Sequence, residues 1–212
     1  MLKGIELLCH SSIKISKDKI IYFDPYQIKE DYHDADIIFI THSHYDHFSL
    51  SDIKKVIKED TMFVVPNGLV TDLLNFGITP KYIIGVVPNQ SYHVLSLDFK
   101  TGPAFNVEKP FHPRENGWVG YILNIADVNY YIAGDTDMTI ENQNVKCDVA
   151  FVPIGGTYTM DYKEASKLIN TIKPKIAVPT HYGLIVGTKK DAINFSNSLD
   201  DDITCEILIK DN

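Results

Sequence analysis

Short runs of apolar residues dominate the first fifty residues of the chain and predict β-strands. These runs cover residues 5–8, 12–15, 19–23 and 37–40. Apolar residues then recur at helical spacing in residues 51–57, where Ser51 or Asp52 would cap a helix, and again in residues 70–74 before Gly77. The N-terminal part of the chain therefore predicts strands that alternate with two helices.

Residues 91–133 show no helical spacing and predict a second group of strands. We expect strands at residues 94–97, 118–125 and 130–133, with a turn at 127–129. Alternation then resumes, with strands at 149–152, 176–178 and 203–209 and helices at 162–172 and 190–199. Without a linker or repeat to divide the chain, this order predicts a single domain over residues 1–212. The expected fold is α/β, a four-layer αββα sandwich of two packed sheets with outer helices.

The composition is that of an ordinary globular domain and disfavours several classes of partner. The 212 residues are 44% hydrophobic and carry a formal net charge of −8, without a cluster of Lys or Arg. We therefore expect no binding to nucleic acid or anionic membrane. The sequence shows neither a signal peptide nor an apolar window of about 18 residues that could span a membrane. Cys9, Cys147 and Cys205 have no C-x-x-C spacing, which favours a reducing cytoplasm.

One short segment carries an unusual density of metal-binding side chains. His42, His44, Asp46 and His47 lie within six residues, directly after the apolar run 37–40. Imidazole and carboxylate groups suit zinc and related metals, and bringing them together on one loop costs little chain entropy. The alternative is a surface loop that happens to be rich in His. Chance rarely places His-x-His-x-Asp-His at the end of a buried strand, so we predict a metal site.

Three further residues lie in loops beside predicted strands. Asp135 follows residues 130–132, His181 follows residues 176–178, and His112 lies in a loop before the strand that begins at 118. Taken alone, a turn Asp or a loop His is usually solvated. A dinuclear site needs more than four protein ligands, however, so together with the His-rich segment these residues become candidate ligands.

Several motifs resemble those of the metallo-β-lactamase superfamily, whose pattern is His-x-His-x-Asp-His, a later His, a later Asp and a final His. Residues 41–47, 133–136 and 179–182 look most similar to the branch that includes ascorbate-6-phosphate lactonase-like proteins and N-acylphosphatidylethanolamine-hydrolysing phospholipase D. Residues 151–156 and 158–161 are similar to that branch's bacterial metal-dependent hydrolases. The resemblance covers essentially the whole chain and implies the metallo-β-lactamase fold.

The resemblance also implies a ligand set for two metal ions. One ion would be bound by His42, His44 and a later His, the second by Asp46, His47 and His181, and Asp135 would bridge them. We place His112 in the position of the later His. Asn106 directly follows residues 103–105, where relatives often have that His, and is the alternative, as a weak ligand or a residue that supports one. We expect His93 on the surface of a strand.

The implied reaction is hydrolysis of a small ester, lactone or phosphodiester by a hydroxide that bridges the metals. Asp46 would orient the hydroxide and pass a proton to the leaving group. Zinc is favoured, and Mn, Fe or Ni would also fit the ligands. Asp24 and His10 are expected near the ligands in supporting roles, although a turn-capping Asp and a structural His are the simpler interpretations.

Three other functions fit parts of the pattern. A metal-dependent nuclease is disfavoured by the acidic net charge, and a di-iron redox site by the abundance of His. A metal-binding module without catalysis is disfavoured by Asp46, which a purely structural site could dispense with. The sequence does not name the substrate, because specificity lies in loops, nor does it define the native metal or the oligomeric state.

Overall fold

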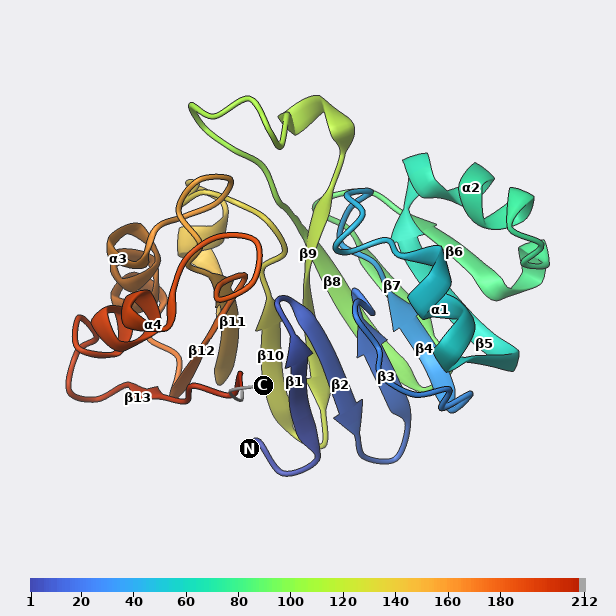
Figure 1. Cartoon of the computed structure of the whole chain (residues 1–212), viewed down its shortest axis with the longest axis horizontal. Coiled ribbons are helices and arrows are strands. Elements are labelled where there is room, and N and C mark those ends of the chain that lie inside the picture. Colours follow the sequence, from blue (N-terminus) through green and yellow to red (C-terminus); the bar gives the residue numbers. More distant parts are fainter. Residues whose placement is uncertain (210–212) are drawn as a thin grey trace. The chain divides into compact units, whose positions relative to one another are not determined.

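The computed structural model describes residues 1–209, and in these the chain divides into two compact units (Figure 1). One unit is Leu2–Val87, and the other is Met1 together with the chain from Pro88 onward. Each unit contains one β-sheet with helices packed against it. The predicted α/β class with two sheets is therefore confirmed, while a single domain over residues 1–212 stays a prediction.

The Leu2–Val87 unit contains a six-stranded sheet in the order β1-β2-β3-β4-β5-β6. Its strands are β1 Ile5–Cys9, β2 Ser12–Ser16, β3 Ile20–Phe23, β4 Ala35–Phe39, β5 Ile57–Pro66 and β6 Ile83–Val86. The first three strands pair antiparallel, and β3 to β6 pair parallel. Parallel pairing needs crossover connections and brings the carboxyl ends of β3 to β6 to one edge of the sheet.

Helices α1 Leu50–Val56 and α2 Val70–Asn75 lie on the crossovers of this sheet, as the apolar spacing predicts. Ser49 rather than Ser51 caps α1, because its side chain accepts a hydrogen bond from the backbone N–H of Asp52. Ile53 of α1 and Leu73 of α2 are fully buried and belong to one apolar cluster with residues of β4 and β5. Two short 3₁₀ turns, Asn67–Leu69 and Pro80–Tyr82, flank α2.

The second unit contains a seven-stranded sheet in the order β13-β12-β11-β10-β9-β8-β7. Its strands are β7 Ser91–Val94, β8 Leu97–Pro103, β9 Val119–Ile125, β10 Val128–Ile132, β11 Val149–Pro153, β12 Ile176–Thr180 and β13 Thr204–Cys205. Strands β7 to β10 pair antiparallel, and β10 to β13 pair parallel. Both units thus run from an antiparallel meander into parallel strands with crossovers.

Two strand predictions and one turn prediction in this unit were wrong in detail. Residues 94–97 form a tight turn in which Val94 ends β7 and Leu97 begins β8, with Leu95 in the left-handed region at φ 54°. The later turn lies at Ala126 and Asp127, whose φ values of 51° and 60° are typical of a tight type I′ hairpin, so Val128 belongs to β10. Of residues 203–209, only β13 pairs with a neighbouring strand.

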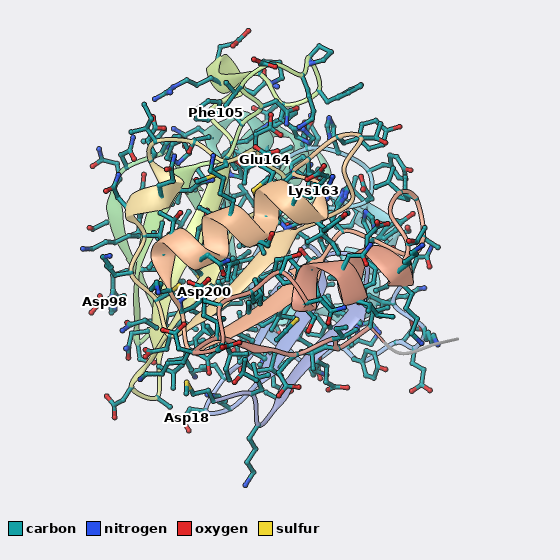
Figure 2. The ribbon with its side chains drawn as sticks, turned by 90° about the vertical axis from the view of Figure 1, so that its left-hand side faces the viewer. Asp18, Asp98, Phe105, Lys163, Glu164 and Asp200 are labelled. Atoms are coloured by element: carbon teal, nitrogen blue, oxygen red, sulfur yellow. The ribbon has the colours of Figure 1, made fainter. Side chains whose placement is uncertain are left out.

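Helices α3 Tyr162–Ile172 and α4 Lys189–Ser196 cover part of this second sheet. The Asp161 side chain caps α3 by accepting hydrogen bonds from the backbone N–H groups of Lys163 and Glu164. Glu164 does not form a capping box with Asp161, and its Oε1 accepts instead from the Met138 backbone N–H at 2.8 Å. Figure 2 shows Lys163 and Glu164 at the start of α3. Burial raises the pKa of the Glu164 carboxyl.

No helix in residues 1–209 has both the length and the hydrophobicity needed to cross a bilayer.

Two additional 3₁₀ turns, Arg114–Asn116 and Asn142–Asn144, lie in the loops after β8 and β10.

The cap at Asp161 makes a testable contribution to stability. Asp161→Ala removes the acceptor for two N–H groups at the start of α3, and we expect it to cost about 1 kcal/mol. For a chain of this size that corresponds to a fall in Tm of about 2–4 °C, measured by circular dichroism. Asp201→Ala, at an exposed turn position, is the control and should leave Tm unchanged. Equal Tm values for both variants would refute the capping role.

Candidate metal-ligating residues

The candidate ligands of the Leu2–Val87 unit lie at the carboxyl ends of two neighbouring parallel strands. Asp24 directly follows β3, and residues 41–47 follow β4. The backbone N–H of Asp24 donates to the carbonyl of Phe39 at 3.0 Å, which extends the pairing of the two strands by one residue. The edge of the sheet therefore brings Asp24 to the His-rich segment.

The carboxylate of Asp24 is a buried acceptor for three hydrogen bonds. Its Oδ1 accepts from the Thr41 backbone N–H at 2.8 Å, and its Oδ2 accepts from Thr41 Oγ1 and from His47 Nδ1, both at 2.7 Å. Because a carboxylate only accepts, Nδ1 of His47 carries the hydrogen and Nε2 carries the lone pair. Asp24 therefore contacts Thr41 and the candidate ligand His47, and its supporting role stays a prediction.

Thr41 links the Asp24 carboxylate to His42 through its hydroxyl group. Its single hydroxyl hydrogen is donated to Asp24, so its oxygen accepts from His42 Nδ1 at 2.9 Å. His42 therefore also presents Nε2, which lies 3.2 Å from Nδ1 of His44. His42 is buried and His44 is half-buried. The two imidazoles converge through nitrogens that can bind one cation.

Asp46 and His10 complete this set of polar side chains. Asp46 Oδ2 lies 3.3 Å from His10 Nε2 and 3.6 Å from His47 Nε2, and all three side chains are buried. His10 lies in the tight turn between β1 and β2 with φ 53°, a left-handed conformation that costs a non-glycine residue about 1–2 kcal/mol. The structure thus places His10 beside Asp46.

The candidate ligands of the second unit also share one sheet edge. Asp135 follows β10, His181 follows β12, and His112 lies in the loop between β8 and β9. Because β9 is antiparallel to both β8 and β10, those two strands run in the same direction and end at the same edge. Three loops that are distant in sequence therefore project together from this sheet.

The carboxylate of Asp135 is the centre of this second set. Its Oδ2 lies 2.9 Å from His181 Nε2 and 3.3 Å from His112 Nε2. All three residues are buried, with exposed fractions of 3% for Asp135, 1% for His181 and 0% for His112. The side-chain oxygen of Asn106 accepts from His112 Nδ1 at 3.0 Å, so His112 presents Nε2 to Asp135. Asn106 therefore contacts His112 through its side-chain oxygen.

His181 is held by close packing as well as by its strand. It has φ 57°, so its backbone also lies in the left-handed region. A Cβ atom added at Gly155 would lie 2.3 Å from the His181 carbonyl oxygen and 2.6 Å from Val186 Cγ2. Only glycine fits at position 155 while the His181 loop keeps this course.

The remaining candidate, His93, lies away from these sets. It is an exposed residue of β7, and its Nδ1 lies 2.7 Å from Asp98 Oδ1 across the β7-β8 hairpin. The hydrogen bond to Asp98 raises the pKa of His93. Its position agrees with the expectation of a strand surface residue.

Two contributors to these sets were missed by the sequence interpretation. Thr41 links Asp24 to His42, and Gly155 leaves room for the His181 loop. The sequence signal for both residues was their position next to the end of a strand. The donors in both sets, imidazole nitrogens and carboxylate oxygens, fit a divalent ion of the zinc type.

Comparison with protein families gives a match over most of the chain. Residues 4–181 match the family model described as the beta-lactamase superfamily domain. A UPF0173 metal-dependent hydrolase of Pyrococcus horikoshii is 30% identical to this chain, over 96% of this chain and 95% of the relative.

Solved structures with the same fold include proteins from two bacteria. A candidate metal-dependent hydrolase of Parabacteroides distasonis is similar with a TM-score of 0.84 and 31% identity, over 96% of this chain and 91% of that one. The metallo-beta-lactamase fold protein YhfI of Bacillus subtilis is similar with a TM-score of 0.72 at 10% identity, over 94% and 90% of the two chains.

The packing of Gly155 against the His181 loop generates a prediction with an internal control. Gly155→Ala should displace the loop and cost about 2 kcal/mol, which lowers Tm by about 4–8 °C. Gly102→Ala, in β8 of the same unit, adds a methyl group where no atom lies within 4 Å and should leave Tm nearly unchanged. The imidazole resonances of His181 should move in the first variant only. Unchanged His181 resonances in Gly155→Ala would contradict this account.

Proposed function

Because the chain belongs to the beta-lactamase superfamily and is one of its metal-dependent hydrolases, we propose that it uses two divalent ions to cleave a small ester, lactone or phosphodiester. The metallo-β-lactamase fold expected from the sequence is confirmed by the solved relatives. In the proposed ligand set, one ion is bound by His42, His44 and His112, the second by Asp46, His47 and His181, and Asp135 binds both. The family pattern and the donor types of these residues support this assignment.

The observation that carries the proposal is the orientation of the imidazole rings within each unit. Buried acceptors hold the Nδ1 hydrogens of His42, His47 and His112, so their Nε2 atoms are the ligand atoms. His47 Nε2 lies 3.6 Å from an oxygen of Asp46, and His112 Nε2 lies 3.3 Å from an oxygen of Asp135. Two acceptors at such distances repel each other unless a proton or a cation lies between them. A preformed set of this kind is what a metal centre requires.

The donor types favour zinc among the divalent metals. Imidazole nitrogens outnumber carboxylate oxygens in the proposed set, and this mixture suits zinc better than magnesium or calcium, which prefer oxygen ligands. Manganese, iron and nickel accept the same donors. We propose zinc as the native metal on this chemical ground.

In the proposed reaction, the metal ions and Asp46 have separate roles. When bound, two divalent ions would supply Lewis acidity and lower the pKa of a nearby water. Asp46 holds a carboxylate oxygen next to the Nε2 atoms of His10 and His47, in a buried environment. A carboxylate in this position can accept a proton during attack and return it to the leaving group. No Ser, Cys or Thr nucleophile is then needed.

The three cysteines suggest where the protein works. Cys9, Cys147 and Cys205 are free thiols, and burial raises the pKa of Cys147 to about 12, so this thiol is protonated at neutral pH. We propose a reducing, cytoplasmic environment, as the sequence suggested.

A panel of chromogenic substrates tests the reaction class. Metal-reconstituted protein is assayed with esters, lactones, phosphodiesters and phosphomonoesters. Single-stranded RNA and DNA are assayed in the same way to test the nuclease alternative. Turnover of one of the small substrates, lost after chelation and restored by metal, is the expected result. Cleavage of the nucleic acids alone would favour a nuclease. Full metal occupancy without turnover of any member would favour a binding module.

The ligand set predicts the metal content of the protein. Elemental analysis of gently purified wild-type protein should give two divalent ions per chain. His112→Ala should lower this content markedly, because it removes a proposed ligand, whereas the control His93→Ala at an exposed strand position should not. A wild-type content that never exceeds one ion after reconstitution would rule out the dinuclear proposal. Equal contents in both variants and the wild type would exclude His112 as a ligand.

The role of Asp46 predicts a separation between metal binding and turnover. Asp46→Asn keeps the size of the side chain and one oxygen, but it removes the negative charge and the proton acceptor. With metal supplied at saturation, we expect turnover to fall by about 10²- to 10⁴-fold, the usual cost of losing a well-placed acid or base. Asp201→Asn at an exposed turn serves as the control. Wild-type turnover in metal-saturated Asp46→Asn would show that Asp46 transfers no proton.

A further inference from the structure

Asn106 makes an unusual number of hydrogen bonds for a loop residue. Its side chain is buried, with 7% exposed, and lies in the loop between β8 and β9. Its Oδ1 accepts from the backbone N–H of His112 and from Nδ1 of the same residue, both at 3.0 Å. Its backbone N–H donates to the carbonyl of His112 at 2.8 Å. Three hydrogen bonds therefore join these two residues and close the segment between them.

The other end of the Asn106 amide determines its orientation. Nδ2 donates to Asp137 Oδ1 at 3.1 Å and to the Tyr158 carbonyl at 2.9 Å. Both partners are acceptors, so a flipped amide would place its oxygen against two further oxygens. The NH₂ group must face Asp137 and Tyr158, and the oxygen must face His112.

Asp137 is itself held firmly as the anchor of this amide. Lys109 Nζ forms a salt bridge with its Oδ1, and the Val107 backbone N–H donates to its Oδ2 at 3.0 Å. The exposed fraction of Asp137 is 3%. A charged, buried acceptor that is fixed on both oxygens leaves the Asn106 amide little freedom to rotate.

The direction of these bonds decides the tautomer of His112. An amide oxygen accepts and cannot donate, so Nδ1 of His112 must carry the hydrogen, and Nε2 must carry the lone pair. Nε2 is the atom that lies 3.3 Å from Asp135 Oδ2. The tautomer set by Asn106 is the one that makes His112 a ligand on the side of Asp135.

We propose that Asn106 is a positioning residue, which sets the tautomer and ring orientation of His112 so that Nε2 is its metal-binding atom. The inference rests on the proposed function, because it presupposes that His112 is a ligand. Asn106 accepts the Nδ1 hydrogen of His112, as the Asp24 carboxylate accepts that of His47. In Asn106 the acceptor is a neutral amide, whose NH₂ group donates to Asp137.

The tautomer is measurable in metal-free protein. Long-range ¹H–¹⁵N correlation spectra at about pH 8.5, two units above the ordinary pKa of imidazole, distinguish the two nitrogens of a neutral ring. His112 is assigned through the resonances that disappear in His112→Ala. We expect the Nδ1–H form in the wild type and its loss in Asn106→Ala. An Nε2–H form in the wild type overturns the proposal.

Two further variants separate positioning from mere loop stability. Asn106→Asp keeps an acceptor for His112 but loses the donor toward Asp137 and Tyr158, so it should lower Tm while retaining the Nδ1–H form. Asn124→Ala removes an exposed amide in β9 that donates to Asn129 Oδ1, and it should change neither quantity. A purely structural role predicts instead that Asn106→Ala and Asn106→Asp lower Tm and leave the tautomer of His112 as in the wild type.

Metal affinity gives the functional readout. In competition with a chromogenic zinc chelator, Asn106→Ala should bind one of its two zinc ions about 10- to 100-fold more weakly than the wild type, and Asn106→Asp should recover part of this loss. A wild-type protein that binds no divalent ion would overturn the proposed function. A wild-type protein that binds two ions, together with an Asn106→Ala variant of equal affinity, would overturn this inference alone.

Discussion

Parallel strands bring their carboxyl ends to one edge of a sheet, and the candidate chemistry of this protein depends on that constraint. Strands β3, β4 and β10 end in apolar residues, and the candidate polar residues follow within three positions. In the Leu2–Val87 unit, β3 and β4 deliver Asp24 and the His-rich segment to adjacent positions. In the second unit, β10 and β12 deliver Asp135 and His181, and β8, which runs in the same direction, delivers the loop of His112.

Within each unit, buried acceptors orient the imidazole rings of the candidate ligands. A histidine at a strand end has two ring nitrogens, and either can carry the hydrogen. Asp24 fixes the tautomer of His47 directly and that of His42 through Thr41. Asn106 fixes the tautomer of His112. These hydrogen bonds hold the rings in the orientation that the proposed metal binding would need.

The backbone also carries strain at these positions. His10, Asp24 and His181 all have φ values between 46° and 57°, where side chains with a Cβ are unfavourable. Each of them is buried and makes contacts with other candidate residues, which hold the strained conformation in place. Such strain is commonly concentrated at functional sites, where the surrounding structure compensates for it. In the loop between β8 and β9, Phe111 precedes His112 and packs edge to face on Tyr158 with ring centroids 4.8 Å apart.

The sequence by itself determined the α/β class, most of the strands, the helix at Tyr162–Ile172, and the candidate ligands next to strand ends. Those features follow from local periodicity and from the spacing of His and Asp. Only the tertiary structure decided that residues 94–97 form a turn, that His10 lies beside Asp46, and that Asn106 contacts His112. The physical reason is that a hairpin register, a ring tautomer or a close glycine contact depends on a partner elsewhere in the chain. Asp24 and His47 are 23 residues apart, and Asn106 and Asp137 are 31 apart, so no local pattern reports their hydrogen bonds.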